Sequence, residues 1–245
     1  FGALIGAIVW NVVTWWYGIP SSSSHALIGG IVGATLVKAG TAPLVAAGIV
    51  KTVAFIVVSP LLGFVCGSLL MVGISWLFAR HTPLRVDGLF RRLQLVSAGL
   101  YSLGHGGNDA QKTIGIVWLL LIVSGLTDAA DKSPPVWVIW SCYLAMGVGT
   151  MFGGWRIVKT MGQRITKLKP VGGFCAEAGG AITLFTASAL GVPVSTTHTI
   201  TGAIYGVGSV RNPSAVRWGL AGHIVMAWVF TIPATAFIAA VFYGI

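Results

Sequence analysis

One short polar stretch inside a long apolar one constrains the fold more than any other part of the sequence. Residues 104–112 read Gly-His-Gly-Gly-Asn-Asp-Ala-Gln-Lys, and residues 93–103 and 113–123 beside them are rich in aliphatic and aromatic side chains. Together they exceed the ~20 residues that a helix needs to cross a bilayer. Three glycines weaken a helix, and unpaired backbone survives in a membrane only where protein or a water-filled cavity surrounds it. The sequence therefore predicts a broken transmembrane helix with a binding site at its middle.

The composition also indicates a membrane protein. The chain is 56% hydrophobic and only 8% charged, whereas roughly 25% of an average soluble domain is charged. Its net charge of +10 would suit nucleic acid in a soluble protein, but the basic residues cluster in short loops, as in multi-pass membrane proteins. We therefore predict a lipid bilayer and no nucleic acid as partner. The three cysteines lack metal-type spacing, so no metal is expected beyond a bound Na⁺.

A second motif occurs twice. Residues 18–25 read Gly-Ile-Pro-Ser-Ser-Ser-Ser-His, and residues 191–198 read Gly-Val-Pro-Val-Ser-Thr-Thr-His, an offset of 198 − 25 = 173. The same offset pairs Gly29 with Gly202 and Pro60 with Pro233. The apolar run after the first motif is too short to span a bilayer, which predicts a re-entrant hairpin. The chain thus contains two copies of one unit, a hairpin followed by a proline-containing span. Pro20 suits the first turn of the hairpin's second arm.

The number of crossings between the hairpins sets their orientation. Three spans lie between them, residues 45–78, 93–123 and 136–152, and an odd number places the hairpins on opposite sides of the membrane. The predicted fold is therefore an all-α integral membrane protein, an inverted-topology repeat transporter with re-entrant hairpins and broken helices. Residues 1–79 form the first repeat, residues 80–92 a basic cytoplasmic linker, and residues 93–245 the second repeat. The C-terminus is expected outside.

The polar stretch has no counterpart in the first repeat. The position equivalent to Asp109 would be 109 − 173 = −64, before the first residue. Either the sequence lacks an N-terminal segment, or the first repeat has lost its half of the site. We favour a missing segment.

The residue types of the three motifs suit an anion together with a cation. Helix N-termini that carry hydroxyl side chains bind oxyanions, and Asn108 and Asp109 offer oxygen ligands for Na⁺ or a site for H⁺. A carboxylate beside an anion site would repel the anion unless a cation binds with it. This pairing is typical of a symporter. The candidate hydroxyls are those of Ser22, Ser23, Ser24, Ser195, Thr196 and Thr197.

Several other polar residues have two interpretations. Glu177 is either a structural carboxylate buried opposite a polar partner, such as the hairpin hydroxyls, or part of the coupling-cation site. His25 and His198 either brace the hairpin turns, which we favour, or contact substrate. Lys112 either neutralises Asp109 at the spacing i, i+3 or attracts the anion. The glycines of residues 104–107 could alternatively permit close helix packing alone.

Residues 104–112 and the paired Pro-x-Ser-(Ser/Thr)-(Ser/Thr)-His motifs resemble the inorganic phosphate transporter family, the phosphate permeases. The resemblance implies two inverted repeats and the transport of inorganic phosphate with Na⁺ or H⁺. It implies that Asn108 and Asp109 bind phosphate and the coupling cation, and that four hairpin hydroxyls face phosphate. The pair Gln111 and Lys112 resembles the bacterial branch, which implies the bacterial inner membrane. The four hydroxyls are those of Ser23, Ser24, Thr196 and Thr197.

Other functions remain as alternatives. An anion channel or uniporter also tolerates re-entrant hairpins, and the site could take another oxyanion such as sulfate. An intramembrane hydrolase is disfavoured, because the neighbours Ser24 and His25 would point about 100° apart on a helix. We therefore expect no enzyme. No phosphate-binding loop for ATP is visible, so no cofactor is expected besides the coupling ion. Exposed small-residue and tryptophan faces make a homodimer plausible.

Overall fold

The computed structural model describes residues 1–128, 130–192 and 194–244, and every regular element in them is helical. No strand occurs in these ranges, which confirms the all-helical prediction. Pro193, the proline of the second hairpin motif, lies outside the described residues. The elements are α1 Gly2–Tyr17, α2 Ser23–Ala39, α3 Ala46–Leu77, α4 Pro83–Val123, α5 Val136–Met151, α6 Trp155–Lys159, the π-helical turn η1 Thr160–Arg164, α7 Pro170–Ala189, α8 Thr196–Arg211, the 3₁₀ turn η2 Pro213–Ala215 and α9 Trp218–Gly244.

Both predicted hairpins are present as pairs of helices. In the first, α1 ends at Gly18, whose φ of 69° suits glycine, and the Ser22 side chain caps α2 by accepting a hydrogen bond from the His25 backbone N–H at 3.3 Å. Ser195 caps α8 in the same way, accepting from the His198 N–H at 3.3 Å. Pro20 precedes the cap, so its predicted place in the first turn of α2 is wrong.

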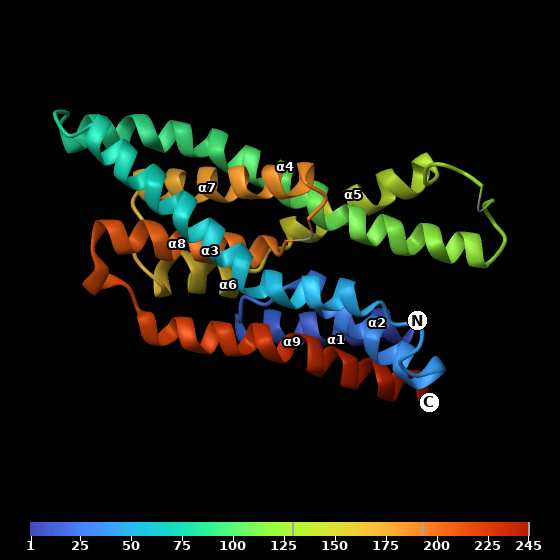
Figure 1. Cartoon of the computed structure of the whole chain (residues 1–245). Coiled ribbons are helices and arrows are strands. Elements are labelled where there is room, and N and C mark those ends of the chain that lie inside the picture. Colours follow the sequence, from blue (N-terminus) through green and yellow to red (C-terminus); the bar gives the residue numbers. More distant parts are fainter. Residues whose placement is uncertain (129, 193, 245) are drawn as a thin grey trace.

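The helices of the two repeats correspond at the predicted offset. Adding 173 to the bounds of α2 gives 196–212, against Thr196–Arg211 for α8. Figure 1 shows that the α1–α2 and α7–α8 hairpins open toward opposite ends of the molecule and that their tips meet near its middle. Each second arm packs on the long helix of the other repeat, α2 on α9 and α8 on α3.

Glycines permit this close packing at equivalent positions. A Cβ at Gly202 would overlap the carbonyl oxygen of Pro60 on α3 and lie 2.7 Å from the carbonyl carbon. At the equivalent Gly29, a Cβ would lie 3.0 Å from Ile232 Cα on α9. Because backbone stands on the other side of both contacts, only a residue without a side chain fits there.

The predicted break at residues 104–112 is wrong, since α4 runs as one helix through the whole stretch. The predicted linker over residues 80–92 is also largely helical, because α4 already begins at Pro83. The interrupted span is instead the next one, in which residues 136–151 and 155–164 meet at 61°. Gly153, with a φ of 66°, lies at this bend.

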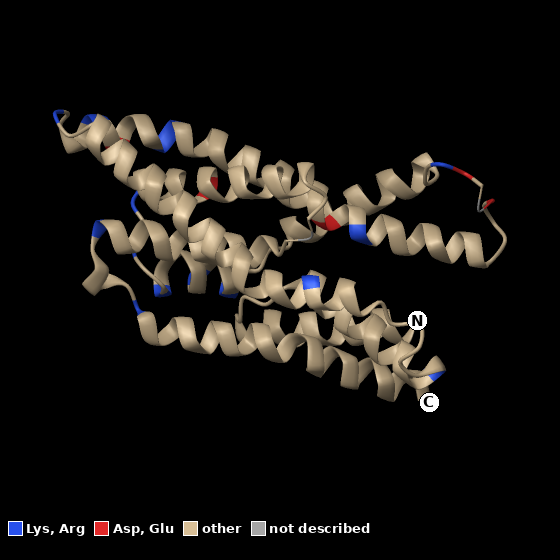
Figure 2. Ribbon diagram, viewed as in Figure 1, with Lys and Arg blue, Asp and Glu red and all other residues tan. Residues whose placement is uncertain are grey.

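Among the described residues, two helices, α3 and α9, are long and apolar enough to cross a membrane, and the bent pair after α4 makes a third candidate. α3 is a single helix despite Pro60. The predicted opposite orientation of the two hairpins depends on this segment crossing the membrane once. In Figure 2 most of the Lys and Arg residues gather at the end where α3 meets α4 and α8 meets α9, while the loop between α4 and α5, which holds acidic residues, lies at the opposite end.

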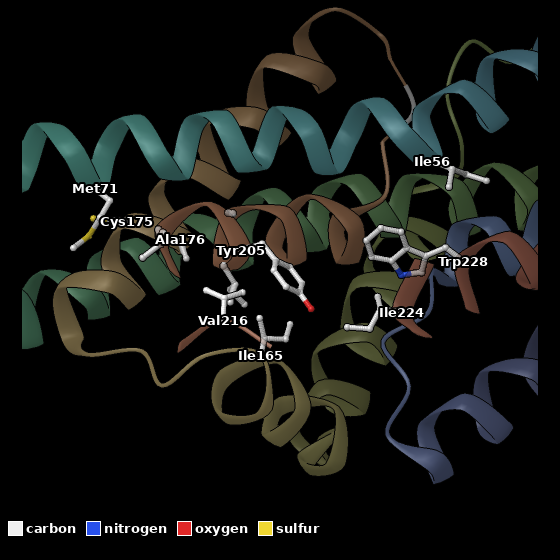
Figure 3. Packing of buried hydrophobic residues seen from close by; sticks show 12 residues of the cluster. Ile56, Met71, Ile165, Cys175, Ala176, Tyr205, Val216, Ile224 and Trp228 are labelled. Atoms are coloured by element: carbon white, nitrogen blue, oxygen red, sulfur yellow. The ribbon is translucent and has the colours of Figure 1, made fainter. Parts of the chain in front are cut away.

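The largest buried cluster fixes the second hairpin. It joins α3, α7, α8 and α9, and Figure 3 shows its labelled members distributed along this junction. Ile165 and Val207 are fully buried in it, and Trp228 is 4% exposed. In a membrane such side chains hold helices together through van der Waals contacts rather than through removal from water, and these contacts fix the α7–α8 hairpin in place.

Candidate functional site

The carboxylate of Asp109 lies between the two hairpin tips and contacts both. The Ser24 hydroxyl, from the first hairpin, donates to Oδ1 at 3.4 Å, and the Thr196 hydroxyl, from the second, donates to Oδ2 at 3.3 Å. Asp109 is only 8% exposed. The structure therefore brings together residues from three of the predicted motifs around one charged group.

This buried carboxylate is stabilised by its surroundings. The positive ends of two helices, α2 and α8, meet at it, and each helix end carries about half a unit charge. Two cationic or hydrogen-bonding side chains of α4 add to this, Lys112 at 3.1 Å from Oδ1 and His105 at 3.2 Å from Oδ2. A carboxylate at this depth would otherwise be costly.

Lys112 does more than pair with Asp109 along the helix. Its ammonium group donates to the Ser24 hydroxyl at 2.6 Å and reaches the backbone carbonyl of Val194 at 3.5 Å. Asn108 also contacts Val194, its side-chain amide donating to the same carbonyl at 3.3 Å. Neighbouring residues of α4 thus join the first hairpin to the loop before α8.

The remaining predicted hydroxyls differ in their placement. Ser22 and Ser195 are buried and serve as helix caps. Ser23 is exposed and faces a cavity lined by α1 and α5 residues such as Asn11 and Met146. Thr197 is half-buried, and within the described parts of the chain neither Ser23 nor Thr197 has a hydrogen-bond partner for its hydroxyl.

Glu177 and Gln111 lie outside the cluster around Asp109. Glu177 accepts hydrogen bonds from Ser97 at 2.7 Å and from Gln94 at 3.3 Å, so it faces polar partners as predicted, but these are residues of α4 and not the hairpin hydroxyls. The reason is the pairing of α7 with α4, which places Glu177 beside Ser97, twelve residues or ~18 Å along α4 from Asp109. Gln111 is exposed.

His25 and His198 contact each other where the hairpin tips meet. Their ring centroids are 4.8 Å apart, and the ring of Trp228 stacks on that of His198 with the centroids 3.9 Å apart. The indole N–H of Trp228 donates to the Pro20 carbonyl at 2.8 Å. Among the described residues, the ring nitrogens of His198 have no hydrogen-bond partner. Packing therefore holds these rings, which supports the bracing role over contact with substrate.

Two members of the site are not singled out by the sequence motifs. Tyr101 donates from its hydroxyl to the Thr196 carbonyl at 3.0 Å, and His105 contacts Asp109. With Asp109 and Lys112, they follow the spacing i, i+4, i+8 and i+11 from Tyr101, which is one face of an unbroken helix. The assumption of a helix break concealed this pattern.

Comparisons with known proteins agree with this geometry. A model described as the phosphate transporter family matches residues 1–239. The chain is 63% identical to a probable low-affinity inorganic phosphate transporter of Rhizobium meliloti, covering 99% of this chain and 72% of the relative. It is 44% identical to the Bacillus subtilis protein of the same name, covering 99% and 73%. A solved structure titled "The sodium-dependent phosphate transporter" aligns with a TM-score of 0.86 at 25% identity, over 99% of this chain and 78% of that one.

Proposed function

Because the chain belongs to the phosphate transporter family, we propose that it binds inorganic phosphate between the two hairpin tips and moves it across a membrane together with a cation. The observation that carries this proposal is the contact of one carboxylate, that of Asp109, with hydroxyls of both hairpins. The relatives are named as transporters and permeases, so no enzymatic reaction is assigned.

The donors around Asp109 suit a tetrahedral oxyanion. The Ser24 hydroxyl and the Lys112 ammonium group are already within 2.6 Å of each other, and the hydroxyls of Ser23 and Thr197 are free of other hydrogen bonds among the described residues. The N-terminal ends of α2 and α8 add backbone N–H groups and positive dipoles. One ammonium group with several neutral hydroxyls binds phosphate more weakly than an arginine cluster would, which favours release.

Asp109 and Asn108 are the proposed ligands of the coupling cation. Carboxylate and amide oxygens suit a hard cation, and a cation beside Asp109 would offset its repulsion of a bound phosphate. We favour Na⁺ over H⁺, because the solved relative is titled a sodium-dependent transporter. Glu177 lies too far along α4 to share this cation, so its coupling role would require a second site.

The arrangement of the hairpins suits alternating access. Their tips meet at the proposed site while their open ends face opposite ends of the molecule (Figure 1), as in inverted-repeat transporters. The positive-inside rule places the basic end in the cytoplasm, which would put the C-terminus outside. The bacterial relatives favour the cell membrane of a bacterium as its location.

Uptake by proteoliposomes tests this proposal. Radiolabelled phosphate is supplied with a Na⁺ gradient and a pH gradient imposed separately, for the unaltered chain, for Asp109→Asn and for Asp87→Asn. Asp87 is a half-buried carboxylate near the start of the same helix, far from the hairpin tips, and serves as the matched control. We expect Na⁺-driven uptake that Asp109→Asn abolishes and Asp87→Asn leaves unchanged.

Three results would contradict all or part of the proposal. Full uptake by Asp109→Asn would remove this carboxylate from the mechanism. Phosphate exchange that neither gradient drives would instead support a uniporter or channel, and uptake driven by the pH gradient alone would replace Na⁺ by H⁺.

A further inference from the structure

Four basic side chains surround a small polar cavity at the basic end of the molecule. The cavity has a volume of about 290 Å³, and Arg164, Lys167, Arg211 and Arg217 line it together with Gln163, Thr166 and Asn212. These residues come from η1 and the loop after it, from the end of α8, and from the connection to α9. None of the described residues that line this cavity is acidic.

The four cations are not neutralised within the described part of the chain. Both ion pairs found there belong to Asp109, and all four basic side chains are exposed. Like charges held around one cavity repel each other, so their convergence is unfavourable unless an anion joins them. We propose that this cavity binds the phosphate group of an anion, either an acidic phospholipid head group or free inorganic phosphate.

The floor of the cavity is rigid. The Arg217 backbone N–H donates to the Ile165 carbonyl at 3.0 Å, which ties the two loops together. Ile165 and Val216 belong to the main buried cluster and lie with Tyr205 in Figure 3. A Cβ at Gly208 would lie only 2.9 Å from Val216. The basic groups are therefore presented from a preformed frame, which lowers the entropic cost of binding.

The chemistry of the lining favours phosphate. Arginine guanidinium groups bind phosphate oxygens through paired hydrogen bonds, and three of the four cations are arginines. A cavity of about 290 Å³ is near the lower limit of ~300 Å³ for ligand sites, which suits a head group or a small ion. Arg211 is the last residue of α8, and that helix end carries about −0.5 charge. Four full positive charges outweigh it.

This cavity is separate from the site at Asp109. Thr196 begins α8 and Arg211 ends it, so fifteen residues, or ~22 Å, lie between the two places. An anion in the cavity cannot be the one held between the hairpin tips. The inference therefore does not depend on the proposed transport function.

Binding to the detergent-solubilised chain tests the proposal. The probes are phosphatidylglycerol, phosphatidylcholine and inorganic phosphate, each titrated at low ionic strength. The test variant is Arg211→Gln with Arg217→Gln, and the matched control is Arg91→Gln with Arg92→Gln, which removes the same charge from exposed positions of α4 at the same end. Each basic residue near a membrane surface contributes about 1 kcal/mol to the binding of acidic lipid. Because the test variant loses two of them, we expect it to bind phosphatidylglycerol about thirtyfold more weakly.

Each outcome has a defined meaning. If the test variant loses phosphatidylglycerol binding but still binds inorganic phosphate like the unaltered chain, the cavity is assigned to a lipid head group. If it keeps phosphatidylglycerol binding but loses one of two inorganic phosphate sites, the cavity is assigned to the free ion. Equal binding by the test variant and the unaltered chain, or an equal loss in the Arg91 and Arg92 variant, would overturn the proposal. Replacing Arg211 and Arg217 by Lys keeps the charge and should restore most of the affinity, and the unfolding temperature of each variant checks that it is folded.

Discussion

The hydrogen bond from Thr196 to Asp109 offers the sharpest test of how the second hairpin acts on the site. Thr196→Val keeps the side-chain shape and removes the hydroxyl that lies 3.3 Å from the carboxylate. Hydrogen bonds to charged groups contribute about 1.5–3 kcal/mol. Since 3.3 Å is long for an O–H···O contact, the lower value of about 1.5 kcal/mol applies. This free energy corresponds to roughly a tenfold change in a binding constant. We therefore expect the apparent KM for phosphate to rise about tenfold.

The assay is phosphate uptake by proteoliposomes at several phosphate concentrations under a fixed Na⁺ gradient. Thr199→Val is the matched control, because among the described residues the Thr199 hydroxyl bonds to the Ser195 carbonyl at 2.9 Å and not to the site. Its KM should stay within twofold of that of the unaltered chain. An unchanged KM for Thr196→Val would refute the role of this contact, and an equal rise in both variants would show that damage to α8 explains the effect.

Three further outcomes are expected. Gly202→Ala should lower the unfolding free energy by about 1–3 kcal/mol, because the added Cβ meets the backbone of Pro60. Gly147→Ala is the control, since its Cβ meets nothing within 4 Å, and equal melting temperatures of the two variants would contradict this packing. Lys112→Gln should weaken phosphate binding in a titration of the purified chain, and unchanged affinity would remove Lys112 from the anion site. A C-terminal tag should react with an impermeant label in intact cells, and labelling only after permeabilisation would reverse the topology.

The hairpins could be predicted because their signals are local. A proline and consecutive hydroxyl residues mark the start of a helix, and Ser22 and Ser195 do cap α2 and α8. The offset of 173 between the two motifs likewise needs no structure, since it is a property of the sequence.

The predicted break in α4 fails because glycine is only a weak local signal. Each glycine costs about 1 kcal/mol in a helix, while a helix of 41 residues is extended cooperatively once formed. Gly104 packs on Leu184 of α7, where an added Cβ would find ordinary contact at 3.5 Å. Tertiary packing of α7 and the hairpins on this face therefore outweighs the local preference.

By itself the sequence determines which residues are available for the site, how the two repeats correspond, and that the chain belongs in a membrane. Only the tertiary structure decides that one carboxylate meets both hairpins and that Glu177 pairs with Gln94 and Ser97 instead. Asp109 is 85 positions from Ser24 and 87 from Thr196. Contacts over such separations depend on the packing of α2 on α9 and of α8 on α3, which no local pattern encodes.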